Sequence, residues 1–244
     1  MKNLSWLREK PIAHRGLHSK DMTIPENSMA AFQSALNKNY PIELDVQLSS
    51  DGLVFVFHDD TLDRLTALKG FIFEQPSSIL RKTTLLKTKA RIPTLEELLA
   101  LVQGRVPLLI EVKTKGPFLA LAEKTAHILD QYQGEFAVQS FHPKIVNWFK
   151  ENRPHFIRGQ IASYFEDETL PFYQKKLLKY MVFNRKNSPD FINYDHTCMP
   201  NWMLNRAHKN GIAVIGYTAQ NQETLTKIKS MYDNAVFEFF DPEN

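Results

Sequence analysis

The sequence predicts an α/β fold of the TIM-barrel type, in which eight parallel strands alternate with helices. The first indication is length, because such a barrel typically takes ~250 residues and the chain has 244. The second is the alternation of β-rich runs and helical patterns from residue 11 onward, in which the β-rich runs number eight. The third is the absence of any internal repeat or linker rich in Gly, Ser or Pro. We therefore expect a single domain over residues 1–244.

Each predicted strand is a short run of mainly apolar and β-branched residues. These runs cover residues 11–14, 41–46, 106–112, 136–141, 156–161, 190–195, 212–218 and 234–240. A helix is predicted over residues 28–39, where apolar residues recur at helical spacing and either Asn27 or Ser28 supplies the N-cap. The next helix begins near Thr94, which stands three residues before Glu97 in a capping-box pattern. Further helices are predicted over residues 119–132, 143–152, 201–211 and 223–232.

One segment departs from this alternation. Residues 42–60, with the sequence IELDVQLSSDGLVFVFHDD, contain two β-rich runs with no room for a helix between them, so we predict a hairpin. A turn centred in the SSDG sequence places His58 opposite Glu43. The same register places Val56 opposite Asp45. Because side chains alternate along a strand, Glu43 and Asp45 share one face.

Two carboxylates beside an imidazole are costly to bury unless a cation or a substrate compensates their charge. A third carboxylate, Glu111, lies in LLIEVKTKG near the end of another predicted strand, with Lys113 two residues later. A barrel collects its active-site groups from the ends of several strands. Carboxylate oxygens suit a hard divalent cation, so we predict that Glu43, Asp45 and Glu111 hold one Mg²⁺ or Ca²⁺ ion.

Further charged and titratable residues surround this predicted metal site. Arg15 and Lys113 supply fixed positive charge, and a guanidinium together with a hard cation binds phosphate well. Glu26 either assists at the site or orients Arg15. His14 and His58 would flank the phosphorus, one removing a proton from the attacking oxygen and the other giving a proton to the leaving oxygen. This set of residues predicts phosphodiester cleavage.

Several short motifs resemble the glycerophosphodiester phosphodiesterase family. They are AHRG, PENSMAAF, IELDVQLSSDGLVFVFHDDTLDRLT, IPTLEELL, IEVK and QSF. The likeness is strong from residue 11 to about residue 66, continues over residues 92–113 and 139–141, and is faint beyond. Because the motifs occur in the order found in the family, together they are more specific than any one of them.

The resemblance implies a phospholipase C-like TIM barrel that hydrolyses glycerophosphodiesters to glycerol phosphate and a free alcohol and depends on Ca²⁺ or Mg²⁺. By position it implies an acid-base pair of His14 and His58, metal ligands Glu43, Asp45 and Glu111, phosphate-contacting cations Arg15 and Lys113, and a further active-site carboxylate, Glu26. It also implies a reaction in two stages. A glycerol hydroxyl next to the phosphate attacks first, and water then opens the cyclic phosphate.

Two regions bear on substrate choice. Residues 59–91 occupy the place of the family's small insertion over the barrel mouth. Near the C-terminus, YTAQ stands where the family has a Trp-Thr-Val-Asn-like motif, and VFEFFDP replaces the usual Gly-Ile-Ile-Thr-Asp ending. Glu238 is then a carboxylate near the mouth with no assigned role. These departures leave the predicted catalytic set intact and the head-group specificity open.

Composition narrows the choice of partners. The chain has 30 basic and 27 acidic residues mixed along its length, which favours no nucleic-acid partner. Its single cysteine, Cys198, excludes an internal disulfide and suits a reducing compartment. No signal peptide h-region and no run of ~20 apolar residues is present, so we expect a cytoplasmic protein without stable membrane insertion that acts on a small molecule. The sequence does not specify an oligomeric state.

Two other functions remain open at this point. A lysophospholipid-specific phospholipase D would need an apolar groove beside the metal, for which FIF at 71–73 and PFYQ at 171–174 are weak candidates. A catalytically silent barrel that binds phosphate esters would show ligand binding without turnover. The presence of both predicted histidines argues against the silent barrel.

Overall fold

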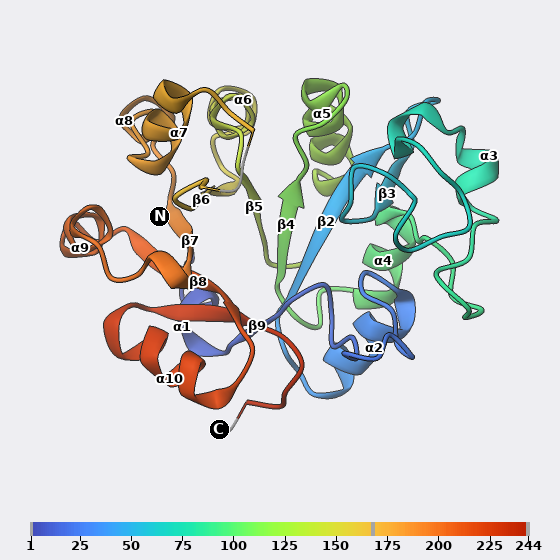
Figure 1. The fold of residues 1–244 in the computed structure, drawn as a ribbon, viewed down its shortest axis with the longest axis horizontal. Coiled ribbons are helices and arrows are strands. Elements are labelled where there is room, and N and C mark those ends of the chain that lie inside the picture. The colour runs from blue at the N-terminus through green and yellow to red at the C-terminus, as the bar shows by residue number, and fades with distance from the viewer. Residues whose placement is uncertain (1, 167–168, 243–244) are drawn as a thin grey trace. The chain divides into compact units, whose positions relative to one another are not determined.

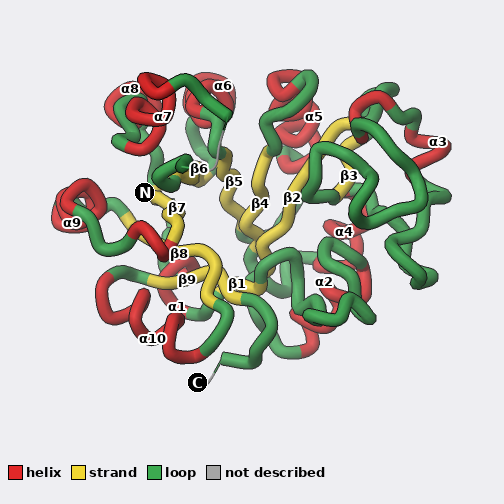
Figure 2. Tube along the Cα trace, in the orientation of Figure 1, coloured by secondary structure: helices red, strands yellow, loops and turns green. Residues whose placement is uncertain are grey.

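The computed structural model describes residues 2–166 and 169–242, and the chain divides into two compact units. Residues 13–136 form one unit, here called the hairpin unit, and residues 1–12 together with 137–244 form the C-terminal unit. Strands and helices follow one another along the chain in both units (Figure 1, Figure 2).

Parallel strands form the interior of the hairpin unit. The second residue of β1 (Ile12–Ala13) pairs with β2 (Ile42–Leu48), and β2 also pairs in parallel with β4 (Leu108–Val112). The short strand β3 (Val54–Val56) runs antiparallel to β2. Every residue of β2 and β4 is buried, as is usual for parallel strands covered on both faces. Polar side chains on β2 and β4 therefore lie in the interior.

The longer helices of the hairpin unit are α2 (Met29–Asn37), α4 (Leu95–Val102) and α5 (Phe118–Leu129). Ser28 is the N-cap of α2, and its hydroxyl accepts a hydrogen bond from the Ala31 amide. The predicted capping box is present in α4, where Thr94 and Glu97 each accept from the backbone amide of the other. Both helices thus begin within a residue or two of the predicted positions.

The predicted hairpin is present, but its predicted register is wrong by one residue. Val56 lies opposite Val46, and not opposite Asp45. The ladder also ends at Val56, so His58 does not lie opposite Glu43 within it. The loop that follows β3 therefore sets the position of His58.

The cause of the shifted register is the length of the turn. The Ser49 amide donates to the Leu53 carbonyl at 2.9 Å, which leaves three residues in the turn in place of the two assumed from the sequence. The Ser49 hydroxyl also accepts from the Leu53 amide at 2.9 Å and donates to Asp51 at 2.7 Å. Gly52 adopts φ +87°, a conformation that favours glycine. One additional turn residue moves every cross-strand pair by one position.

The segment after the hairpin, which includes the predicted insertion over residues 59–91, is mostly loop (Figure 2). It contains the 3-10 helix η1 (Ile72–Glu74) and the short helix α3 (Ser77–Leu80). The segment packs around a cluster of buried apolar side chains, namely Phe55, Phe57, Leu62, Leu65, Ile72, Leu80, Leu85 and Ile92. Burial of these side chains holds a loop-rich segment in one conformation.

The C-terminal unit contains five parallel strands among its described residues, and each pairs with the next. They are β5 (Phe136–Ser140), β6 (Ile157–Ala162), β7 (Phe191–Asp195), β8 (Ala213–Ala219) and β9 (Asn234–Phe237). Its helices are α1 (Trp6–Glu9), α6 (Pro143–Asn152), α7 (Phe172–Lys179), α8 (Asn184–Asn187), α9 (Trp202–Lys209) and α10 (Gln222–Met231), with the 3-10 helix η2 (His196–Cys198) after β7.

All eight predicted barrel strands are present in the described part of the chain, with ends that differ from the prediction by at most three residues. β9 ends at Phe237, so Glu238 follows the strand and does not belong to it. Helices α1, α3, α7 and α8 have no counterpart in the sequence prediction. No helix among the described residues combines the length and the apolar character needed to cross a membrane.

Candidate active site

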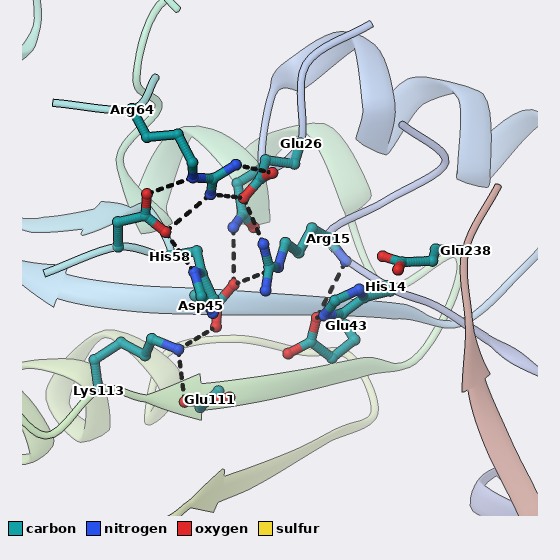
Figure 3. Close-up of polar contacts among 12 residues, drawn as sticks. His14, Arg15, Glu26, Glu43, Asp45, His58, Arg64, Glu111, Lys113 and Glu238 are labelled. Atoms are coloured by element: carbon teal, nitrogen blue, oxygen red, sulfur yellow. Dashed lines mark hydrogen bonds and ion pairs between the residues drawn. The ribbon is translucent and has the colours of Figure 1, made fainter. Parts of the chain in front are cut away.

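The eight residues predicted to form the site all belong to the hairpin unit, and Figure 3 shows their side chains converging. They are His14, Arg15, Glu26, Glu43, Asp45, His58, Glu111 and Lys113. Glu43 and Asp45 come from β2, and Glu111 comes from β4. Parallel pairing places Asp45 directly beside Glu111. The remaining residues belong to loops that follow β1, β3 and β4 or precede α2.

The three carboxylates predicted as metal ligands form a compact, buried cluster. Oxygens of Glu43, Asp45 and Glu111 lie within 4.8 Å of one another. The exposed fractions of these residues are 3%, 1% and 7%. The ammonium of Lys113 lies 2.8 Å from Glu111 and 3.1 Å from Asp45, and the Arg15 Nε lies 3.4 Å from Asp45. Two cations therefore partly neutralise three buried negative charges.

Protonation equilibria reflect this incomplete neutralisation. Burial, together with repulsion from Asp45 and Glu111, raises the pKa of Glu43 well above its usual value. Burial opposes ionisation of Asp45 as well, but the charges of Lys113, His58 and Arg15 outweigh it and hold the pKa of Asp45 below its usual range. Burial acts to lower the pKa of Lys113, yet attraction to Asp45 and Glu111 raises it. The cluster therefore favours additional positive charge next to Glu43.

Unusual backbone conformations shape the loop that carries Arg15. Arg15 has φ 52° and the next residue, Gly16, has φ +76°. A Cβ on Gly16 would lie 2.7 Å from the carbonyl carbon of Ala31, so the close approach to α2 requires glycine. Asn27 has φ 53°. Its backbone N–H donates to the Arg15 carbonyl at 3.0 Å, and its side-chain N–H donates to Asp45 at 2.9 Å. The HRG and PEN motifs are thus linked to each other and to β2.

The two histidines have different surroundings. His14 Nε2 lies 3.9 Å from the Glu43 carboxylate. His58 Nδ1 is 2.7 Å from the carboxylate of Asp59, and Figure 3 shows the ring beside Asp45. A carboxylate at Nδ1 orients an imidazole and leaves Nε2 to exchange protons with another group. Asp59 therefore fixes the ring of His58.

Arg64 is a site residue that the sequence analysis did not single out. Its guanidinium makes two hydrogen bonds to Asp59, at 2.6 and 2.8 Å, and two to Glu26, at 2.9 and 2.7 Å. Glu26, which is 2% exposed, also accepts from Arg15 at 2.5 Å. Burial disfavours ionisation of Glu26, but the hydrogen bonds from Arg64 and the charge of Arg15 outweigh it and lower its pKa. The signal was present, because Arg64 lies within the DDTLDRLT part of the family-like motif.

The donor set fits a hard divalent cation. Glu43, Asp45 and Glu111 offer only oxygen ligands, which Mg²⁺ and Ca²⁺ prefer. Within the hairpin unit, five carboxylates of this cluster (Glu26, Glu43, Asp45, Asp59 and Glu111) face three fixed cations (Arg15, Arg64 and Lys113). A divalent cation would offset this excess of carboxylates. Another group that could hold a metal is Glu26, His58 and Asp59. Both of its carboxylates are already hydrogen-bonded to Arg64, and Glu26 is also bonded to Arg15, so this group fits a metal less well.

We expect Arg64→Ala to lower the free energy of unfolding at pH 7 by about 1–2 kcal/mol, because the buried Glu26 carboxylate loses two hydrogen-bond donors. The native pKa of Glu26 is depressed, so its stabilising contribution is present above its unfolded pKa of about 4.3 and is lost as the pH falls through the native pKa. The difference between wild type and variant should therefore shrink below about pH 4.

Urea unfolding at several pH values measures this difference. Arg81→Ala is the matched control, because Arg81 and Glu97 form an ion pair in which both side chains are about half exposed. It should cost less than about 0.5 kcal/mol. A cost for Arg64→Ala that does not change between pH 7 and pH 3 would contradict this account of Glu26.

Comparison with known proteins assigns the family. Residues 14–238 match the model of the Glycerophosphoryl diester phosphodiesterase family. YhdW of Bacillus subtilis, which is named as a glycerophosphodiester phosphodiesterase, is 31% identical over 229 residues, and the match covers 90% of each chain. A glycerophosphodiester phosphodiesterase of Caldanaerobacter subterraneus is 28% identical over 246 residues, covering 95% of this chain and 94% of the relative.

Solved structures show the same fold. A phosphodiesterase of Oleispira antarctica, in complex with the product sn-glycerol-3-phosphate, superposes with a TM-score of 0.80 at 23% identity, covering 96% of this chain and 94% of its own. A glycerophosphodiester phosphodiesterase of Thermotoga maritima gives 0.73 at 23% identity, covering 94% of each chain. The predicted fold class, a TIM barrel, is confirmed. In the described part of the chain, β3 is a ninth strand, which pairs antiparallel with β2 and is additional to the eight parallel ones. The chain belongs to the glycerophosphoryl diester phosphodiesterase family, and so to the phosphoric diester hydrolases.

Proposed function

We propose that this protein is a metal-dependent glycerophosphodiester phosphodiesterase that hydrolyses glycerophosphodiesters to glycerol phosphate and a free alcohol. The observation that carries the proposal is the buried cluster of Glu43, Asp45 and Glu111 in direct contact with Lys113 and Arg15. Family membership supports the same reaction, and the Oleispira antarctica phosphodiesterase was solved with sn-glycerol-3-phosphate as product.

In this proposal Glu43, Asp45 and Glu111 hold one Mg²⁺ or Ca²⁺ ion. The raised pKa of Glu43 supports this metal site. A raised pKa means that the cluster favours a positive charge at Glu43, and a bound cation would supply that charge in place of a proton. When bound, the metal neutralises negative charge that develops on the non-bridging phosphate oxygens. Asn27 keeps Asp45 in position through its 2.9 Å hydrogen bond.

Arg15 and Lys113 then bind the phosphate. An ammonium has three N–H donors, and Lys113 uses two contacts on Asp45 and Glu111, which leaves one donor for a phosphate oxygen. Arg15 is oriented from two sides, by Glu26 at Nη1 and by Asp45 near Nε. Glu26 is thus a positioning residue in this proposal, because Arg15 and Arg64 occupy both of its oxygens. A fixed guanidinium stabilises the transition state without reorganising first.

His14 and His58 divide the proton transfers. In each stage one histidine takes the proton of the attacking hydroxyl as its oxygen bonds to phosphorus, and the other gives a proton to the oxygen that leaves. In the first stage a glycerol hydroxyl attacks and the alcohol leaves. In the second, water attacks the cyclic phosphate and the glycerol oxygen takes up the proton. Asp59 supports this role for His58, since it holds Nδ1 and leaves Nε2 available.

The first test is release of glycerol phosphate from glycerophosphocholine and glycerophosphoethanolamine, with Mg²⁺, with Ca²⁺ and with a chelator. We expect activity to need metal and Glu43→Gln to lower turnover by at least about 100-fold, because a ligand of the charge-neutralising ion is lost. Glu96→Gln, which removes an exposed carboxylate from α4, is the control and should retain wild-type turnover.

Other outcomes of this test distinguish the alternatives. Metal binding with release of choline only from lysophosphatidylcholine would identify a lysophospholipase D. Binding of phosphate esters with no turnover in any metal would indicate a silent barrel. Full activity in Glu43→Gln would show that the carboxylate cluster does not hold the catalytic metal.

The second test concerns the histidines. We expect His14→Asn and His58→Asn each to lower kcat by about 10²–10⁴-fold while metal affinity, measured by calorimetry, stays within a few-fold of wild type. The double variant should be about as slow as the slower single variant, because the two residues act in the same step. His155→Asn, an exposed histidine outside the site, serves as the control. A folded His58→Asn protein that binds metal and keeps full turnover would refute the acid-base assignment.

A further inference from the structure

An unusual surface covers residues 171–186, which form α7, α8 and the turn between them. Eleven large apolar side chains are exposed in the described part of the chain, and six of them lie in this stretch. The six are Phe172, Tyr173, Leu177, Tyr180, Val182 and Phe183. Helix α7 has no buried residue at all. Scattered exposed apolar residues are normal, but a group of six on one short segment marks an interaction surface.

The apolar residues of α7 face solvent. Tyr173, Leu177 and Tyr180 are spaced four and three residues apart, so they share one face of the helical segment. Their exposed fractions are 62%, 36% and 44%. Leu178 and Met181, on the other side, are partly or fully buried. The outward face of a surface helix is ordinarily polar, so this helix presents apolar groups where a soluble domain ordinarily has charged ones.

Within this segment the charges have one sign, and the nearest acidic residues in the sequence are Glu166, Asp167 and Glu168 before it and Asp190 after it. Five basic residues and no acidic residue occur between Thr169 and Pro189, namely Lys175, Lys176, Lys179, Arg185 and Lys186. The Lys176 ammonium lies 4.5 Å from the centre of the Phe172 ring, and the Lys179 ammonium lies 3.4 Å from that of Tyr164. Cations and aromatic rings are therefore interleaved, and the ammonium groups stand beside the apolar face.

We propose that this basic-aromatic face, residues 171–186, docks the protein on the surface of a membrane that contains anionic phospholipids. Aromatic and aliphatic side chains would enter the headgroup region, and the lysines and arginine would pair with lipid phosphates. Charge complementarity selects this partner, because protein interfaces are depleted in lysine, whereas lysines flanking Phe, Tyr and Leu characterise helices that lie in the membrane interface. The proposal does not depend on the reaction that the protein catalyses.

Co-sedimentation with vesicles tests the proposal. The wild-type protein should bind vesicles of phosphatidylcholine mixed with an equal amount of phosphatidylglycerol, and should not bind vesicles of phosphatidylcholine alone. Binding should weaken as salt rises. Tyr173→Ser/Leu177→Ser removes two apolar contacts, and Lys176→Gln/Arg185→Gln/Lys186→Gln removes three exposed charges. Each should lower the vesicle partition constant by about tenfold or more.

Two control variants remove the same chemistry elsewhere. Lys82→Gln/Lys87→Gln/Lys89→Gln takes three exposed charges from the basic run at 81–91, and Ile79→Ser/Leu119→Ser takes two exposed apolar side chains. Both should bind anionic vesicles as the wild type does. Lys176→Gln/Arg185→Gln/Lys186→Gln should hydrolyse soluble glycerophosphodiesters at the wild-type rate, so loss of docking is distinguishable from failure of the proposed function.

Three results would overturn the proposal. The first is a wild-type protein that does not bind anionic vesicles. The second is a control variant that loses binding as much as its counterpart on the basic-aromatic face. The third is self-association of the wild type, seen by sedimentation velocity and abolished in Tyr173→Ser/Leu177→Ser, without vesicle binding. If the apolar variant fails to fold, the charge variant, which changes only exposed side chains, still decides the question.

Discussion

Burial of three carboxylates on adjacent strands is the constraint on which the rest of the hairpin unit depends. Glu43 and Asp45 lie on β2, and Asp45 pairs in register with Glu111 on β4. Water is largely excluded from all three, so each negative charge needs a partner within the protein or from a bound ion. Such an arrangement destabilises the apo protein unless it is compensated. A buried acidic cluster of this kind is therefore better explained by a function than by stability.

The compensation comes from residues far apart in the sequence. Lys113 reaches back from the end of β4, and Arg15 reaches in from a loop whose shape requires Gly16 against α2. Arg64 adds an outer layer of ion pairs. It binds both Glu26, which orients Arg15, and Asp59, which orients His58. The phosphate-binding side and the proton-transfer side of the proposed site are thus held by one continuous set of ion pairs. A change at Arg64 affects both sides at once.

The features that were predictable from the sequence are those set by local spacing. Alternation along β2 put Glu43 and Asp45 on one face, and the capping box placed the start of α4. The hairpin register could not be predicted, because the Ser49 side chain closes a three-residue turn that resembles a two-residue one in the sequence. Arg64 meets Glu26 across 38 positions, a contact that no local pattern encodes. Helix α7 escaped prediction because its apolar face points to solvent, contrary to the usual rule.

The most direct measurement tests whether a divalent ion binds at the carboxylate cluster. Crystals of the wild-type protein soaked with Mn²⁺, a hard divalent ion, would show its position by anomalous scattering. We expect an ion bound by oxygens of Glu43, Asp45 and Glu111, with Arg15 and Lys113 beside it. An ion held instead by Glu26, His58 and Asp59, or a carboxylate cluster that stays without metal at saturating Mn²⁺, would rule out the proposed metal site.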